Sequence, residues 1–103
     1  MNIQDTIKQQ ISEHPIILYM KGSVEMPRCG FSARAVSLLK SCGVPFVTVD
    51  VLQDEVLREG IKIFSHWPTI PQLYVKGEFI GGCDIMTEMH TSGELQMLLK
   101  DFA

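Results

Sequence analysis

The residues most able to do chemistry are a cysteine and a serine three positions apart, Cys29 and Ser32. Loop-forming residues precede the cysteine and a helical pattern follows it, so we expect its thiol at the N-terminus of a helix. Unpaired backbone N–H groups and the positive end of the helix dipole favour a thiolate there, the form that attacks disulfides and binds metals. In dithiol redox motifs a second cysteine stands where Ser32 stands here. Cys29 therefore cannot form a disulfide within its own motif.

Two further candidates are a lysine at the end of a predicted strand and the residue before a proline. Lys21 ends a predicted strand and is expected at the same end of the sheet, where its charge would favour a thiolate or an anionic ligand. A solvated lysine is an equally good interpretation of this residue alone. Ile70 precedes Pro71, and a proline that opens a strand suits a cis bond or a turn that exposes the backbone of residue 70. That backbone could pair with an extended peptide, although proline more commonly just ends a loop.

The segment Gly81-Gly82-Cys83-Asp84 is the other candidate binding element. Two glycines allow a ligand to approach the backbone closely, and the N–H groups at a helix start favour a carboxylate. The alternative is a tight turn with an ordinary helix cap. Arg58 lies away from the apolar face of its helix and is otherwise a surface arginine. Cys42 falls on an apolar stripe and is predicted to lie in the core, as a lone cysteine usually does.

Hydrophobic periodicity predicts the elements that position these residues. A helix ends near residues 14–15, and the apolar run at 16–20 predicts a strand buried on both faces. A helical stripe and a strand at 46–49 follow, which completes a right-handed βαβ unit. The predicted members of the stripe are Phe31, Ala35, Leu38, Leu39 and Cys42.

The second half of the chain predicts a helix, a hairpin and a helical C-terminus. The helix covers residues 54–65, and Gly60 inside it is expected to bend or split it, at a cost of about 1 kcal/mol against alanine. Strands at 72–75 and 79–80 flank a short turn, which predicts an antiparallel hairpin. Asp84 is the expected N-cap of a helix from residue 85. Thr91 and Glu94 have the spacing of a capping box for a terminal helix.

Length and composition predict one globular domain over residues 1–103, 46% hydrophobic and 20% charged, and the order of the predicted elements makes it an α/β protein. The net charge of −3 gives no electrostatic basis for binding nucleic acid or an anionic membrane. The longest apolar run, residues 15–20, is far too short to span a membrane. Three irregularly spaced cysteines and the lack of a signal-peptide pattern favour the cytoplasm, with a processed organellar protein left open.

Four segments together, in order along the chain, resemble the monothiol glutaredoxins of the CGFS type. They are Lys21-Gly22-Ser23, Cys29-Gly30-Phe31-Ser32, Trp67-Pro68-Thr69-Ile70-Pro71-Gln72 and Gly81-Gly82-Cys83-Asp84. The resemblance covers residues 16–99. It implies a thioredoxin-like fold, in which a four-stranded mixed sheet is flanked by helices and Pro71 is cis.

The same resemblance implies a glutathione site. Lys21 and Arg58 would meet the glycine carboxylate, and the backbone of Ile70 would pair with the cysteinyl part. Cys83 and Asp84 would bind the γ-glutamyl end. Residue 70 is aromatic or aliphatic in the family, so Ile70 is a mild departure that leaves a backbone role intact.

The resemblance further implies a bridging [2Fe-2S] cluster, which needs four thiolate-type ligands. Cys29 and one glutathione from each of two chains would supply them, which gives a homodimer. A cluster carrier or scaffold is thus the leading hypothesis, with iron–sulfur recipient apoproteins as partners. The alternative is a glutathione-dependent thiol oxidoreductase that uses Cys29 for deglutathionylation. A third possibility is an interaction module for a BolA-like protein. Whether Cys29 and Cys83 form a disulfide under oxidation is left open.

Overall fold

The computed structural model describes residues 2–103 and contains one four-stranded mixed sheet, ordered β2-β1-β3-β4. The central strand β1 pairs in parallel with β2 and antiparallel with β3, and β3 pairs antiparallel with β4. The strands are β1 (Ile16–Met20), β2 (Val47–Asp50), β3 (Gln72–Val75) and β4 (Glu78–Gly81). The central position of the apolar strand 16–20 is confirmed, because all five of its residues are buried.

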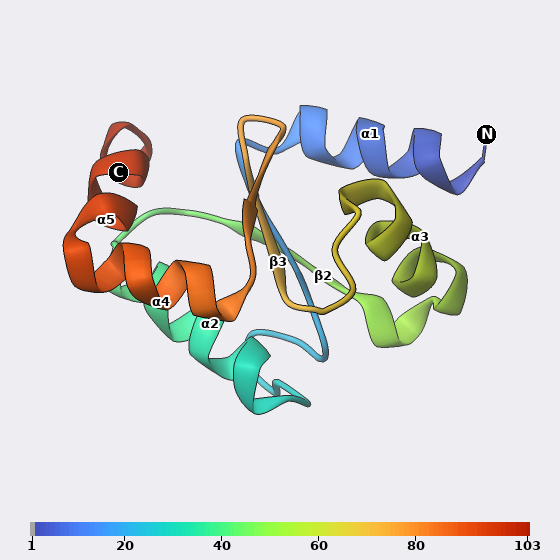
Figure 1. The fold of residues 1–103 in the computed structure, drawn as a ribbon, viewed down its shortest axis with the longest axis horizontal. Coiled ribbons are helices and arrows are strands. Elements are labelled where there is room, and N and C mark those ends of the chain that lie inside the picture. The colour runs from blue at the N-terminus through green and yellow to red at the C-terminus, as the bar shows by residue number, and fades with distance from the viewer. Residues whose placement is uncertain (1) are drawn as a thin grey trace.

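Helices cover both faces of the sheet. On one face lie α1 (Ile3–Glu13) and α3 (Glu55–Ser65), and on the other lie α2 (Gly30–Ser41), α4 (Cys83–Ser92) and α5 (Glu94–Leu99), as Figure 1 shows. Two short 3₁₀ helices, η1 (Val51–Gln53) and η2 (Lys100–Phe102), follow β2 and α5. Within residues 2–103 no helix has the length and apolar character needed to cross a bilayer.

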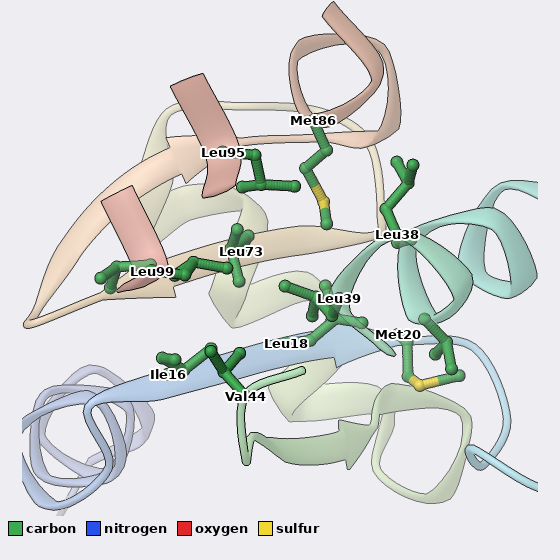
Figure 2. Packing of buried hydrophobic residues seen from close by; sticks show 13 residues of the cluster. Ile16, Leu18, Met20, Leu38, Leu39, Val44, Leu73, Met86, Leu95 and Leu99 are labelled. Atoms are coloured by element: carbon green, nitrogen blue, oxygen red, sulfur yellow. The ribbon is translucent and has the colours of Figure 1, made fainter. Parts of the chain in front are cut away.

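The sheet separates two hydrophobic clusters, and alternate residues of β1 contribute to each. Ile16, Leu18 and Met20 pack under α2, α4 and α5 in the cluster drawn in Figure 2. Ile17 and Tyr19 join the cluster under α1 and α3. This alternation follows from the two-residue period of a strand. β1 is therefore held between two layers of helices, and the C-terminal end of this strand leads into the loop before Cys29.

The stripe predicted for α2 is correct except at its first residue. Ala35, Leu38 and Leu39 are buried, and Cys42 is partly buried against the same cluster. Phe31 was predicted to be in the core, and this is wrong: it is 63% exposed. Residue 31 lies in the first turn of α2, one turn before Ala35, and is not part of the cluster under that helix.

The predicted bend or break at Gly60 is also wrong, because α3 is continuous over residues 55–65. The glycine instead allows α1 and α3 to approach closely. A Cβ at position 60 would lie 3.0 Å from Cγ1 of Ile3, and the Gly60 carbonyl accepts a hydrogen bond from Gln4 at 3.1 Å. Helix packing therefore offsets the low helix propensity of Gly60.

The hairpin is confirmed: Lys76 and Gly77 both have positive φ (51° and 80°), as a two-residue I′ turn requires. Two cap predictions are wrong. The N-cap of α4 is Gly82, and Asp84 lies in the first turn of that helix. Thr91 lies inside α4, where its hydroxyl donates to the Thr87 carbonyl at 3.0 Å. The break between α4 and α5 is at Gly93 instead.

Candidate functional site

A pocket of about 430 Å³ lies at the end of the sheet where β1 runs into the loop before α2. One wall is that loop with the start of α2, which contributes Lys21, Cys29 and Phe31. The opposite wall comes from the end of α3, the 67–71 loop and the start of α4. Segments that are far apart in sequence thus meet around the thiol of Cys29.

Cys29 is the N-cap residue of α2 and has an extended backbone. Burial opposes ionisation of its thiol. The N–H groups of Ser32 and Phe31, the Lys21 charge and the Ser32 hydroxyl outweigh it and lower the pKa of Cys29. These are the groups that a helix N-terminus supplies to a thiolate. The sequence prediction that Cys29 is a helix-start thiol is confirmed.

Ser32 connects the two sides of the loop. Its side chain is fully buried, and its hydroxyl accepts a hydrogen bond from the Lys21 N–H at 3.0 Å. The hydroxyl proton is therefore free to be donated to the sulfur of Cys29, which contributes to the lowered pKa of that thiol. Ser32 cannot resolve a disulfide, but its hydroxyl fixes the backbone of Lys21 beside the start of α2.

Ser32→Ala is expected to raise the pKa of Cys29 and to slow its alkylation at neutral pH, because the variant loses a donor to the thiolate. The measurement is the iodoacetamide alkylation rate against pH, resolved by residue with mass spectrometry. The control is Ser12→Ala, which removes an exposed hydroxyl on α1 that bonds the Gln9 carbonyl. An unchanged alkylation profile in Ser32→Ala would contradict this role of the hydroxyl.

Asp50, the last residue of β2, anchors the loop that carries Cys29. Its carboxylate accepts hydrogen bonds from the N–H groups of Gly22 and Leu52, both at 2.9 Å. Burial would raise the pKa of Asp50, but these two bonds, one from Gln53 and the Arg28 charge together lower it. The carboxylate therefore holds the loop in its ionised form.

The lowered pKa of Asp50 predicts a pH dependence of stability. Its contribution is fully present above the unfolded-state value of about 3.9 and is lost as the pH falls through the lower folded-state pKa. Wild-type protein should therefore lose more unfolding free energy between about pH 6 and pH 3 than Asp50→Asn, which keeps an acceptor oxygen. Urea denaturation at each pH measures this, with the exposed Asp101→Asn as control. Equal losses in wild type and Asp50→Asn would exclude Asp50 as the source.

The 67–71 loop presents backbone to the pocket at Ile70. The Ile70–Pro71 peptide bond is cis, as the family resemblance implied. The Ile70 side chain packs into the core with only 6% of the residue exposed, although the residue lines the pocket. No backbone group within residues 2–103 hydrogen-bonds to the N–H or carbonyl of Ile70. These backbone groups are thus available to an extended ligand.

The charges of the pocket lie on separate elements. Lys21 and Lys62 line it as cations, and Asp84 lines it as an anion beside Cys83 at the start of α4. The structure thus brings Lys21, Cys29, Ile70, Cys83 and Asp84 to one pocket.

Arg58 is the predicted site residue that does not line the pocket. It lies one turn before Lys62 on α3, and its guanidinium is 3.9 Å from the Glu55 carboxylate. Its Nε is buried and has no hydrogen-bond partner within residues 2–103. Lys62 takes the place on the pocket wall that the prediction gave to Arg58.

The lining residues that were not predicted as site residues include Phe31, Lys62, Trp67 and Ile85. Phe31 was assigned to the core because of its helical spacing alone. Lys62 could have been found from the i, i+4 spacing with Arg58, since both project from one face of a helix. Trp67 could have been found from its place in the segment 67–72, one of the four that carry the family resemblance.

Comparison with known proteins places these features in a family. The Glutaredoxin family profile matches residues 16–80. A protein named Glutaredoxin 4 from Pasteurella multocida (strain Pm70) is 56% identical over 103 residues, which is 100% of this chain and 94% of that protein. The solution structure of reduced apo GrxS14 from poplar superposes with a TM-score of 0.83 at 46% identity, covering 96% of this chain and 91% of that one.

A crystal structure of a buckwheat glutaredoxin–glutathione complex shares the fold, with a TM-score of 0.84 at 22% identity over 96% of this chain and 88% of that one. The predicted thioredoxin-like fold is confirmed by these superpositions.

Proposed function

Since the chain belongs to the glutaredoxin family, we propose that it binds glutathione in this pocket and carries a [2Fe-2S] cluster between two copies of itself. The observation that carries the proposal is a single thiol with a lowered pKa at one edge of a pocket whose cations and anion lie on separate elements. The protein would act as a carrier or scaffold that delivers the cluster to recipient apoproteins.

Glutathione has charged groups at both ends and a thiol between them, and the pocket matches this order. Lys21, with Lys62 and Arg58 from α3, would hold the glycine carboxylate. The free backbone of Ile70 would pair with the cysteinyl part as a short added strand. The first N–H groups of α4, at Cys83 and Asp84, would bind the γ-glutamyl carboxylate. The Asp84 carboxylate would face the γ-glutamyl amino group.

The cluster is the cargo in this proposal, and its ligand count favours a dimer. A [2Fe-2S] cluster takes four ligands of thiolate type. No three ligating side chains converge on a metal-sized site anywhere in residues 2–103. Cys29 and the glutathione thiol beside it would give two ligands per chain, so two chains complete the set. Each glutathione can exchange, which suits a cluster that must be transferred.

Anaerobic reconstitution of the wild-type protein tests the proposal. Iron, sulfide and reduced glutathione should together give a visible chromophore that elutes with a dimer on size-exclusion chromatography. Omitting glutathione should prevent both, because half of the ligands are then missing. A protein that stays colourless and monomeric with all components present would contradict the proposal.

The lowered pKa of Cys29 also favours a second function, glutathione-dependent deglutathionylation. The Cys29 thiolate would attack the glutathionyl sulfur of a mixed disulfide and release the substrate thiolate. A second glutathione thiolate would then attack the glutathionyl sulfur on Cys29, which releases glutathione disulfide and regenerates the Cys29 thiolate. Ser32 cannot replace this second glutathione. Rapid turnover of a glutathionylated peptide without cluster formation would favour this function over cluster transfer.

A BolA-like protein is the further partner that we propose, within a cytoplasmic setting. Affinity capture with the cluster-loaded dimer and with the apo protein, from an extract of the native cell, tests this. Recovery of a BolA-like protein on one of the two forms would support it, and its absence from both would contradict it.

A further inference from the structure

The structure has two fully buried polar side chains within residues 2–103, Ser32 and Gln72. Ser32 acts on Cys29, whereas no role described so far involves Gln72. This residue opens β3 immediately after the cis Ile70–Pro71 bond and pairs with Tyr19 of β1. Its amide is thus fixed to the sheet directly behind the loop that forms one wall of the pocket.

The Gln72 amide binds that loop at two points. Its Nε2 donates to the carbonyl of Trp67 at 3.2 Å and to the carbonyl of Thr69 at 3.1 Å. Its Oε1 accepts from the buried hydroxyl of Tyr74 at 3.0 Å. Carbonyl oxygens only accept, so the NH₂ group must face the loop and Oε1 must face Tyr74. Burial raises the pKa of Tyr74 to about 12, so its hydroxyl stays protonated and can donate.

Trp67 is held by these bonds and by others from α3. Its backbone N–H donates to the Lys62 carbonyl at 3.2 Å and to the Ser65 hydroxyl at 3.1 Å. Its indole nitrogen lies 3.6 Å from the position that a Cβ on Gly82 would take. The indole therefore sits against the turn that leads into α4. The conformation of the loop thus sets the distance between Ile70 and the start of α4, the two parts of this pocket wall that are proposed to bind the ligand.

We propose that Gln72 is a positioning residue for glutathione, which fixes the 67–71 loop by drawing the carbonyls of Trp67 and Thr69 toward β3. With these two carbonyls turned away from the pocket, the free backbone of Ile70 and the indole of Trp67 face the ligand. The identity of the ligand as glutathione rests on the proposed function. The fixing of the loop rests on the hydrogen bonds alone.

Gln72→Met tests the proposal, because methionine has a similar length and no donor. The carbonyl of Thr69 then loses its side-chain donor and that of Trp67 keeps only the longer bond from the Ser65 hydroxyl, so we expect the dissociation constant for reduced glutathione to rise about tenfold. Isothermal titration measures it. Trp67 is the single tryptophan of the chain, so acrylamide quenching of its fluorescence reports on the loop and should increase.

Val75→Ala is the matched control, since it removes buried apolar volume from the same strand at the end away from the loop. It should lower the unfolding free energy but leave glutathione affinity and Trp67 quenching unchanged. If Gln72→Met does not fold, Tyr74→Phe replaces it. That variant removes only the bond to Oε1 and should shift both readouts in the same direction by a smaller factor.

The outcomes separate this proposal from the proposed function. Wild-type affinity and quenching in Gln72→Met, or an equal loss of affinity in Val75→Ala at matched stability, would overturn the positioning role. A wild-type protein that does not bind glutathione would overturn the proposed function. Acrylamide quenching of Trp67 in Gln72→Met would then still test whether Gln72 fixes the loop. Increased quenching would support this role, and wild-type quenching would refute it.

Discussion

Cys29→Ser is expected to abolish the reconstituted chromophore and the dimer, whereas Cys42→Ser and Cys83→Ser should keep both. A serine hydroxyl does not ionise near neutral pH, so each chain would lose its own ligand to the cluster. Cys42 packs against the core at the end of α2, where burial raises the pKa of its thiol. Absorption spectroscopy after anaerobic reconstitution, with size-exclusion chromatography, measures the effect.

Cys83→Ser is the stringent control, because Cys83 is a free thiol that lines the same pocket as Cys29. Its proposed contribution is its backbone N–H, which serine also has. Loss of the chromophore in Cys83→Ser, or its retention in Cys29→Ser, would contradict the ligand set. Cys29→Ser should still bind reduced glutathione, since Lys21 and Asp84 are unchanged. That binding distinguishes loss of a ligand from loss of the site.

Gly22→Ala is expected to destabilise the fold by about 3 kcal/mol and to disturb the loop that carries Cys29. Gly22 has φ of +92°, and a Cβ there would lie 2.5 Å from the Met26 carbonyl oxygen and 2.6 Å from the Arg28 nitrogen. Both are backbone atoms of a loop closed by the hydrogen bond from the Arg28 N–H to the Lys21 carbonyl at 2.8 Å. The added methyl group would therefore have to open the loop.

Gly43→Ala is the matched control, because Gly43 also has positive φ (+69°) but no atom within 4 Å of the place that an added methyl group would take. It should show only the backbone cost of about 1 kcal/mol. Urea denaturation measures both variants, and alkylation of Cys29 reports on the loop. Equal losses of stability in the two variants would show that crowding at Gly22 does not matter.

The sequence by itself determined the order of elements and the location of the site. The four-residue spacing of apolar residues in α1, the continuous apolar run of β1 and the Lys76-Gly77 turn of the β3–β4 hairpin are local signals, so these elements could be predicted without tertiary contacts. The motif around Cys29 and the glycines at 81–82 marked two walls of one pocket. They meet at one end of the sheet because β4 runs in the same direction as β1, so the starts of α2 and α4 lie beyond the same edge.

The tertiary structure alone decided what each side chain faces. Phe31 has the spacing of a core residue, but it is largely exposed and lines the pocket beside Cys29. Gly60 was predicted to bend or split α3, but the glycine is instead required by the close approach of Ile3 of α1. Lys62 rather than Arg58 lines the pocket because it lies one turn nearer the C-terminal end of α3, which leads into the 67–71 loop. The Ser32 hydroxyl bonds to the backbone of Lys21, eleven residues earlier, which no sequence pattern pairs with it. Periodicity gives the faces of an element, whereas only packing decides which neighbour each face meets.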